Sequence, residues 1–263
     1  MKRMQNSFPC KRKSKVRQIV ATAVCVLVAV TAPVAGFQIA KAKNEVRFSA
    51  GEYWFLTFYR GKNALSAKEA ASSLLLRGGA GYIENGDTVA VFGCVYGDKA
   101  EADRAAEGIL AAGTNVWTEK RTASIYLPKG SETLAALEVL LAGVEDAFLS
   151  ARKLYRAMDE GTSAALIGSQ AEAAAERALA AAKEVAARLT MLPSARKTRG
   201  RIAKNEQKGR FSLREGAALL TECAARFRTV TSENAGERFG TENAVAVRRA
   251  MIELTLSYLA LFS

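Results

Sequence analysis

Histidine is absent from the 263-residue chain. This absence excludes Ser-His-Asp and Cys-His nucleophile systems, histidine general bases and zinc sites of the HExxH type. The Walker A and GxGxxG patterns are also missing, so the sequence gives no support for nucleotide chemistry. Acidic residues are scattered over predicted helix faces and show no paired arrangement typical of lytic chemistry. The sequence therefore predicts a protein that is not an enzyme, with no catalytic residues and no cofactor.

Cysteine is scarce, with four residues at Cys10, Cys25, Cys94 and Cys223. The first lies in a basic segment and the second in an apolar run. No two cysteines have the CxxC spacing of a metal site, so no bound metal is expected. Cys94 and Cys223 form either a disulfide or two buried free thiols, and we favour the free thiols.

Acidic residues are missing from the first 44 positions, the first being Glu45. Seven basic residues precede it in a terminal arm: Lys2, Arg3, Lys11, Arg12, Lys13, Lys15 and Arg17. They supply more than half of the net charge of +12, which leaves the rest of the chain mildly basic. A basic arm in front of an apolar run is typical of a membrane topology signal. We therefore expect a cytoplasmic arm at residues 1–17 and no nucleic-acid partner.

The next 23 residues, 18–40, carry no formal charge and are rich in Ala and Val. A helix needs about 20 such residues to cross a bilayer. The pattern predicts a single transmembrane signal anchor in the lipid bilayer, a cell-membrane localisation and an extracytoplasmic remainder that begins with a linker at 41–51. The alternative is a signal peptide cleaved near Ala40-Lys41-Ala42. The apolar run is longer than the roughly 7–15 residues of a normal signal core, which favours the uncleaved anchor.

From residue 52 the pattern changes to short strands and helices. Glu52–Tyr59 is rich in aromatic and β-favouring residues, as a buried strand would be. A helix follows, with Ser66 placed as its N-cap and Glu69 three residues later, the spacing of a capping box. Gly78 and Gly79 are expected to end this helix, because glycine tolerates the left-handed conformation found there.

The second half of this unit repeats the order. A short strand at 80–84 leads into the Asn-Gly turn of Asn85–Asp87 and a further strand at 88–96. Asp98 is placed to cap a second helix that Gly113 ends, and a last strand follows. The order β-α-β-β-α-β predicts an α+β fold, with a four-stranded sheet and both helices on one face.

Several stretches of this unit resemble a known family. They are FLTFY, NALSAKEAASSLL, GGAGYI, VAVFGCVY and KAEADRAAEGI. Together they resemble the SPOR domain, a peptidoglycan-binding module of bacterial division and sporulation proteins. The resemblance implies a ferredoxin-like βαββαβ domain at residues 52–127 and peptidoglycan glycan strands as the partner. A Gln of the family's first strand has no counterpart here, since Trp54 or Phe55 fills its place, and Thr57 stands for a serine.

The helix-free face of such a sheet is the expected binding platform, because an uncovered apolar face would otherwise aggregate. Alternation places Val89, Val91, Gly93 and Val95 on one face of their strand and Ala90, Phe92 and Cys94 on the other. The predicted glycan-binding residues are Phe55, Thr57, Tyr82, Phe92 and Trp117. Core or edge packing is the alternative for each of them, and a slip of one residue would reverse every assignment.

After Pro128 the composition shifts to Ala, Leu, Glu and Arg. Apolar residues recur at helical spacing, for example at Leu134, Leu137, Leu141, Val144 and Phe148. We predict a helical domain at 128–263, built from four amphipathic helices with a basic linker at 193–210. These helices form a bundle that stands alone, packs against the sheet unit or contacts a partner.

Two functions follow from these predictions. The first is a membrane-anchored, non-catalytic peptidoglycan-binding protein that acts in cell division or sporulation. The alternative is an extracytoplasmic interaction scaffold whose helical bundle recruits a protein partner.

Overall fold

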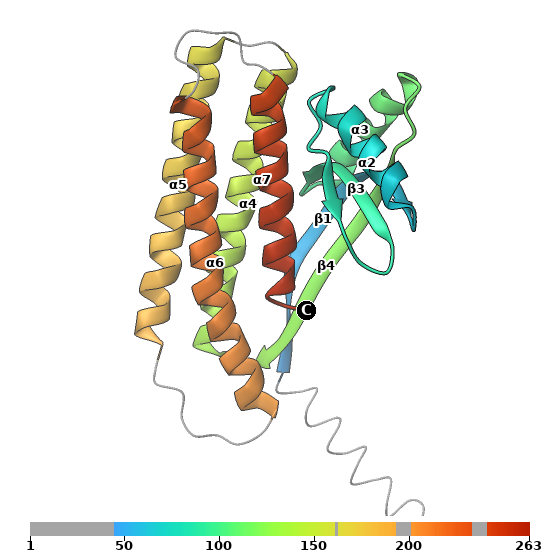
Figure 1. Ribbon diagram of the computed structural model, residues 1–263. Coiled ribbons are helices and arrows are strands. Elements are labelled where there is room, and N and C mark those ends of the chain that lie inside the picture. The colour runs from blue at the N-terminus through green and yellow to red at the C-terminus, as the bar shows by residue number, and fades with distance from the viewer. Residues whose placement is uncertain (1–44, 161–162, 193–200, 233–240) are drawn as a thin grey trace, which may run out of the picture. The chain divides into compact units, whose positions relative to one another are not determined.

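The computed structural model describes residues 45–160, 163–192, 201–232 and 241–263. The contacts divide the chain after Val46, and the fold below is that of the unit Arg47–Ser263. Its elements run in the order strand, helix, strand, strand, helix, strand, followed by four long helices (Figure 1).

The strands form one sheet in the order β2-β3-β1-β4. Their bounds are β1 (Glu45–Gly61), β2 (Tyr82–Glu84), β3 (Val89–Tyr96) and β4 (Trp117–Pro128). β3 pairs antiparallel with both β1 and β2. The contacts Arg47–Ser124 and Glu52–Lys120 run in opposite directions along β1 and β4, which makes this pair antiparallel as well. A hairpin at the Asn-Gly dipeptide joins β2 to β3, as predicted from the sequence.

Two bulges interrupt the pairing of β1 with β3. The register passes from Leu56↔Cys94 to Thr57↔Phe92 and then to Tyr59↔Val91, which leaves Gly93 and Phe58 as extra residues on opposite strands. The Phe58 ring lies against Gly93, where an added Cβ would be 2.4 Å from Cε2 of that ring. The strand needs glycine at this position because no side chain fits beneath the ring.

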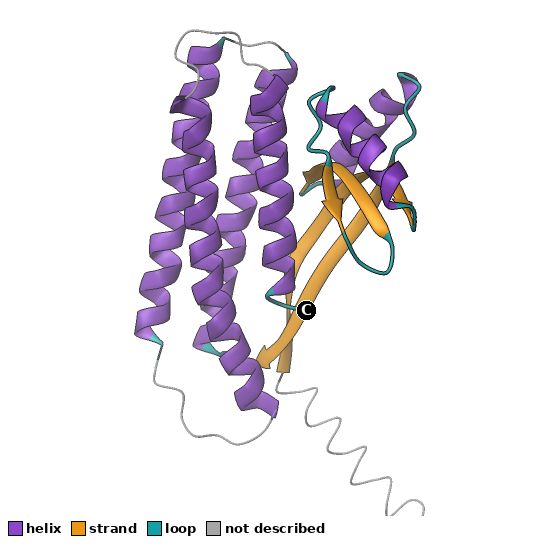
Figure 2. Cartoon of the chain, in the orientation of Figure 1, coloured by secondary structure: helices purple, strands orange, loops and turns teal. Residues whose placement is uncertain are grey.

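Helices α2 (Ala64–Leu75) and α3 (Lys99–Ala111) lie together beside the upper part of the sheet (Figure 2). They touch the bundle at its edge, where Arg152 of the first long helix pairs with Glu101 of α3. Asn63 caps α2 and accepts hydrogen bonds from the backbone N–H groups of Leu65 and Ser66. The predicted cap at Ser66 is therefore wrong by three residues. The predicted cap at Asp98 is confirmed, since its side chain accepts from the backbone N–H of Glu101.

The four long helices pack as a bundle. Their bounds are α4 (Glu132–Asp159), α5 (Ala164–Met191), α6 (Arg201–Ser232) and α7 (Thr241–Ala260). Small residues let them approach closely: an added Cβ on Gly143 of α4 would lie 2.8 Å from Cβ of Ala181, and one on Gly216 of α6 would lie 2.4 Å from Leu140. The predicted apolar stripes face inward, with Leu137, Val144, Leu220, Phe227 and Met251 all buried.

The bundle covers the sheet face that α2 and α3 leave open. Tyr53 of β1 packs on Phe148 of α4 and on Tyr258 of α7, with ring centroids 4.9 and 6.2 Å apart. Further along, Phe48 packs on Phe262 at 5.5 Å. One buried cluster therefore joins the sheet to the bundle. The result is three layers, with the sheet between the helix pair and the bundle.

The predictions that depend on a membrane segment need correction. The predicted transmembrane segment 18–40 lies outside the described residues, and none of the helices within them is long and apolar enough to cross a bilayer. On this finding we correct the fold class to α+β with a four-stranded sheet and six helices in the described chain, and withdraw the cell-membrane localisation. The expected arm at 1–17 also lies outside the described residues.

Two predicted linkers contain regular structure. The linker predicted at 41–51 contains the start of β1, and the one predicted at 193–210 contains the first turns of α6 from Arg201 onward. The predicted domains at 52–127 and 128–263 share one core. Cys94 and Cys223 are both buried free thiols, as favoured from the sequence.

Candidate functional site

The predicted platform residues fall into two groups. Phe55, Thr57 and Phe92 are fully buried, with 0 % of their surface exposed, because the bundle covers their face of the sheet. The rings of Phe55 and Phe92 pack together with centroids 5.0 Å apart. Tyr82 is partly buried beside α6 and α7. Trp117, at the start of β4, keeps 43 % of its surface exposed.

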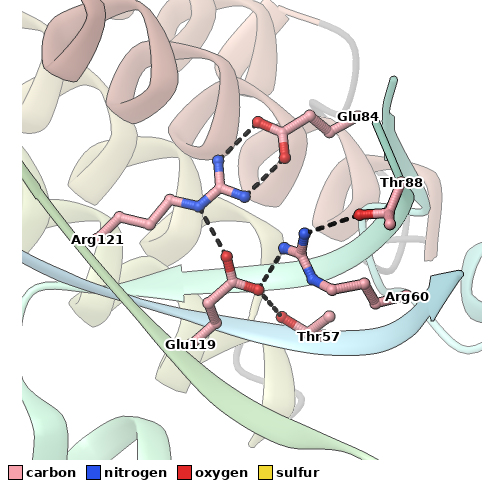
Figure 3. A network of polar contacts seen from close by, with 6 residues as sticks. All are labelled: Thr57, Arg60, Glu84, Thr88, Glu119 and Arg121. Carbon is pink, nitrogen blue, oxygen red and sulfur yellow. Dashed lines mark hydrogen bonds and ion pairs between the residues drawn. The ribbon is translucent and has the colours of Figure 1, made fainter. Parts of the chain in front are cut away.

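Charged side chains form a network (Figure 3). It lies on the same face as the buried rings, since Arg121 is placed over Phe55 and Phe92. Arg121 of β4 is its centre: its two terminal nitrogens donate to the two carboxylate oxygens of Glu84 at 2.6 Å each. Its Nε donates to Oε1 of Glu119 at 3.0 Å. Arg60 of β1 donates to Oε2 of Glu119 at 2.5 Å and to Oγ1 of Thr88 at 3.3 Å. Side chains from β1, β2 and β4 thus meet in one network.

The buried rings support this network from below. The guanidinium carbon of Arg121 lies 5.2 Å from the Phe55 ring centroid and 4.9 Å from that of Phe92. A cation over an aromatic face is attracted to the ring's electrons. The hydrogen bonds from Arg121 to Glu84 raise the pKa of the guanidinium, which therefore stays charged. Thr57, the other buried platform residue, donates to Glu119 at 3.5 Å.

The network remains accessible to solvent. The side chains of Arg60, Glu84, Glu119 and Arg121 are between 22 % and 36 % exposed. Beside them is a hollow of about 470 Å³, lined by Glu84, Lys120, Arg121 and Thr122 from the sheet side and by the end of α7. A ligand can therefore reach carboxylate acceptors and guanidinium donors that are already held in position.

Trp117 shares a face with the network. Side chains alternate along β4: Thr118 donates to Asp103 of α3 on one face, whereas Glu119 and Arg121 join the network on the other. By this alternation Trp117 lies on the network's side of the sheet. Of the five platform residues predicted from the sequence, it is the one that is exposed on this face.

The charged residues of the network were not predicted. The signal was present in WTEKR, where Trp117, Glu119 and Arg121 occupy alternate positions, and in YIE, where Glu84 is two residues from Tyr82. Alternate charged residues on a face expected to be apolar indicate a part of that face that stays in water.

The geometry offers hydrogen bonding but no metal site. Among the described residues, no group of three or more cysteine, aspartate or glutamate side chains is placed to hold a metal ion.

Comparison with known proteins assigns no family. No protein-family model, no curated protein and no solved structure matches the chain.

Proposed function

We propose that the chain is a non-catalytic carbohydrate-binding protein whose ligand is the glycan strand of peptidoglycan, bound across the polar network and Trp117. The observation that carries this proposal is an exposed tryptophan on the same sheet face as a preorganised set of paired carboxylates and guanidinium groups. The resemblance of residues 52–127 to SPOR domains supports the ligand class.

The chemistry of the site matches a sugar. Carboxylate oxygens accept hydrogen bonds from hydroxyl groups, guanidinium groups donate to hydroxyl or carbonyl oxygens, and each carboxylate has lone pairs beyond those used by Arg121. The aromatic face of Trp117 can stack on the apolar face of a pyranose ring. We therefore assign the binding surface to the exposed polar side chains and not to the buried rings.

The charge balance favours a sugar backbone over a polyanion. Arg60 and Arg121 are matched by Glu84 and Glu119, so the network carries no net charge. A polyanion such as nucleic acid would need an excess of basic residues at this place. A glycan chain needs donors and acceptors in similar number, which this network provides.

A second candidate function is the interaction scaffold in which the bundle recruits a protein. Three large apolar side chains on the bundle support it: Leu149 of α4, Leu166 of α5 and Phe211 of α6 are each about half exposed. This function does not require the polar network.

Binding of the full chain to purified, amidase-treated sacculi tests the proposal. We expect Trp117→Ala to weaken binding by about tenfold or more, because aromatic residues in contact with a ligand dominate affinity. Tyr126→Ala is the matched control: Tyr126 lies on the same strand, is 45 % exposed and has buried neighbours on either side, Ile125 and Leu127. Equal retention of both variants and the unsubstituted chain would rule out the network face as the glycan site and favour the scaffold.

A further inference from the structure

A groove lies between α2 and α3, on the sheet face that these two helices cover, and Arg248 of α7 reaches its lining. Its volume is about 650 Å³, within the range of small-molecule sites. Leu56, Phe58 and Cys94 of the sheet line it, with Leu74 of α2 and Ile109 of α3. It is separate from the polar network, none of whose members lines it.

Small residues keep the groove open. Ala70 of α2 and Ala105, Gly108 and Ala112 on or just after α3 line it. A Cβ added at Gly108 would meet no atom within 4 Å. Burial raises the pKa of the Cys94 thiol, so this part of the lining is uncharged. The body of the groove is therefore apolar.

The charge at the groove has one sign. Arg77, Arg104 and Arg248 line it, and its lining includes no aspartate or glutamate from the described chain. Two of the arginines are held by loop residues that follow α2 and α3: Arg77 donates to Oγ1 of Thr114 at 2.6 Å, and Arg248 of α7 donates to the carbonyl oxygen of Gly78 at 2.7 Å. These contacts hold two guanidinium groups in the lining of an apolar groove.

We propose that the groove binds a fatty acid, with the alkyl chain between α2 and α3 and the carboxylate at Arg77 and Arg248. The alkyl chain of the ligand matches the apolar lining. Its carboxylate matches the arginine side chains, because a planar guanidinium pairs with carboxylate through two parallel hydrogen bonds. A glycan strand would leave its hydroxyl groups without partners against Leu56, Leu74 and Ile109.

Calorimetric titration of the full chain with dodecanoate, below its micelle concentration, tests this proposal. We expect one saturable site. Dodecanol, with the same chain and no charge, and dodecyltrimethylammonium, with the opposite charge, are expected to bind at least about tenfold more weakly, since a charge-assisted hydrogen bond is lost. Similar affinity for all three would overturn the proposal. Dodecylphosphocholine binding as tightly as dodecanoate would assign the groove to phospholipid and also overturn it.

Two substitutions on α3 locate the site. Gly108→Leu fills the groove without displacing any atom near its Cβ, and it should reduce dodecanoate affinity at least about tenfold. Glu107→Leu places the same side chain at an exposed neighbour that does not line the groove, and should leave affinity unchanged within about twofold. Unchanged binding by Gly108→Leu would place the ligand elsewhere.

A third substitution tests the carboxylate end. Arg77→Gln should weaken dodecanoate but not dodecanol, because only dodecanoate carries the charge that Arg77 recognises. Equal losses for both ligands would contradict the assigned orientation. Thermal unfolding of each variant confirms that the fold is retained.

Discussion

The two faces of the sheet are covered by helices in different ways. On the bundle face, large aromatic rings such as Tyr53, Phe92 and Tyr258 fill the space between layers and are almost completely buried. On the other face, α2 contributes Ala67, Ala71 and Leu74 to a small cluster around Val91, and a groove remains beside it. Large rings seal one interface, whereas small residues bring helices close at some points and leave space at others.

The difference shows which face is free to bind ligands. The face expected to be open has most of its aromatic residues in the core, and its charged end and Trp117 reach solvent. The face expected to be closed retains a cavity. Substitutions that add or remove atoms on each face test this comparison directly.

The largest effect is expected on the bundle face. Phe92→Ala removes a ring that is fully buried between the sheet and its neighbours, and should lower the free energy of unfolding by about 3–5 kcal/mol. Phe211→Ala removes the same ring from a site on α6 that is 49 % exposed, and should change stability by less than about 1 kcal/mol. Urea unfolding measures both. Similar losses would mean that the bundle does not seal the sheet.

An intermediate effect is expected on the groove face, where two glycines differ sharply. Gly93→Ala forces a methyl group against the Phe58 ring and should destabilise by about 1–3 kcal/mol. Gly108→Ala adds a methyl group in open space on a helix and should stabilise by up to about 1 kcal/mol.

A double variant checks the cause of the first change. With Phe58→Leu in the background, Gly93→Ala should be less damaging, because the ring that it would meet is gone. If Gly93→Ala lowers the free energy of unfolding by the same amount in this background, the cause is the strand's backbone and not the ring.

The smallest effect at neutral pH concerns a thiol in the bundle. Burial raises the pKa of Cys223 from 9.0 to about 12. Below pH 9 the folded and unfolded states both hold the thiol proton; between pH 9 and about 12 only the unfolded state loses it. The free energy of unfolding should therefore fall as pH rises through this window, by about 1 kcal/mol per pH unit for this group.

Cys223→Ala removes this contribution. The variant should show a shallower loss of stability with pH above 9 in urea unfolding, and no change in slope between pH 6 and about 8. An identical alkaline slope in both proteins would show that the thiol is accessible to water.

Local signals in the sequence predicted most elements correctly. The Asn-Gly turn lies between β2 and β3, and Asp98 caps α3. These signals involve residues a few positions apart, so they act before any tertiary contact. Asn63 and Ser66 lie three positions apart, and both are residue types that cap helices. The prediction chose Ser66, whereas Asn63 forms the cap.

The face of the sheet on which each residue of β3 lies was predicted correctly only up to the bulge at Gly93. Val91 and Phe92 lie on opposite faces, as expected. Beyond Gly93 the assignment reverses: Cys94 pairs with Leu56 and lines the groove, whereas Val95 pairs with Phe55. The bulge depends on the Phe58 ring from another strand, and the alternation within β3 contains no sign of it.

The sequence by itself determined the order of strands and helices and the buried stripe of each bundle helix. Only the tertiary structure decided that the bundle packs on the sheet, which places Phe55 and Phe92 in the core and leaves the Arg121 network and the α2–α3 groove accessible. The reason is physical. An apolar stripe favours burial but does not specify the surface that buries it, and that choice depends on the fit between side chains far apart in the chain.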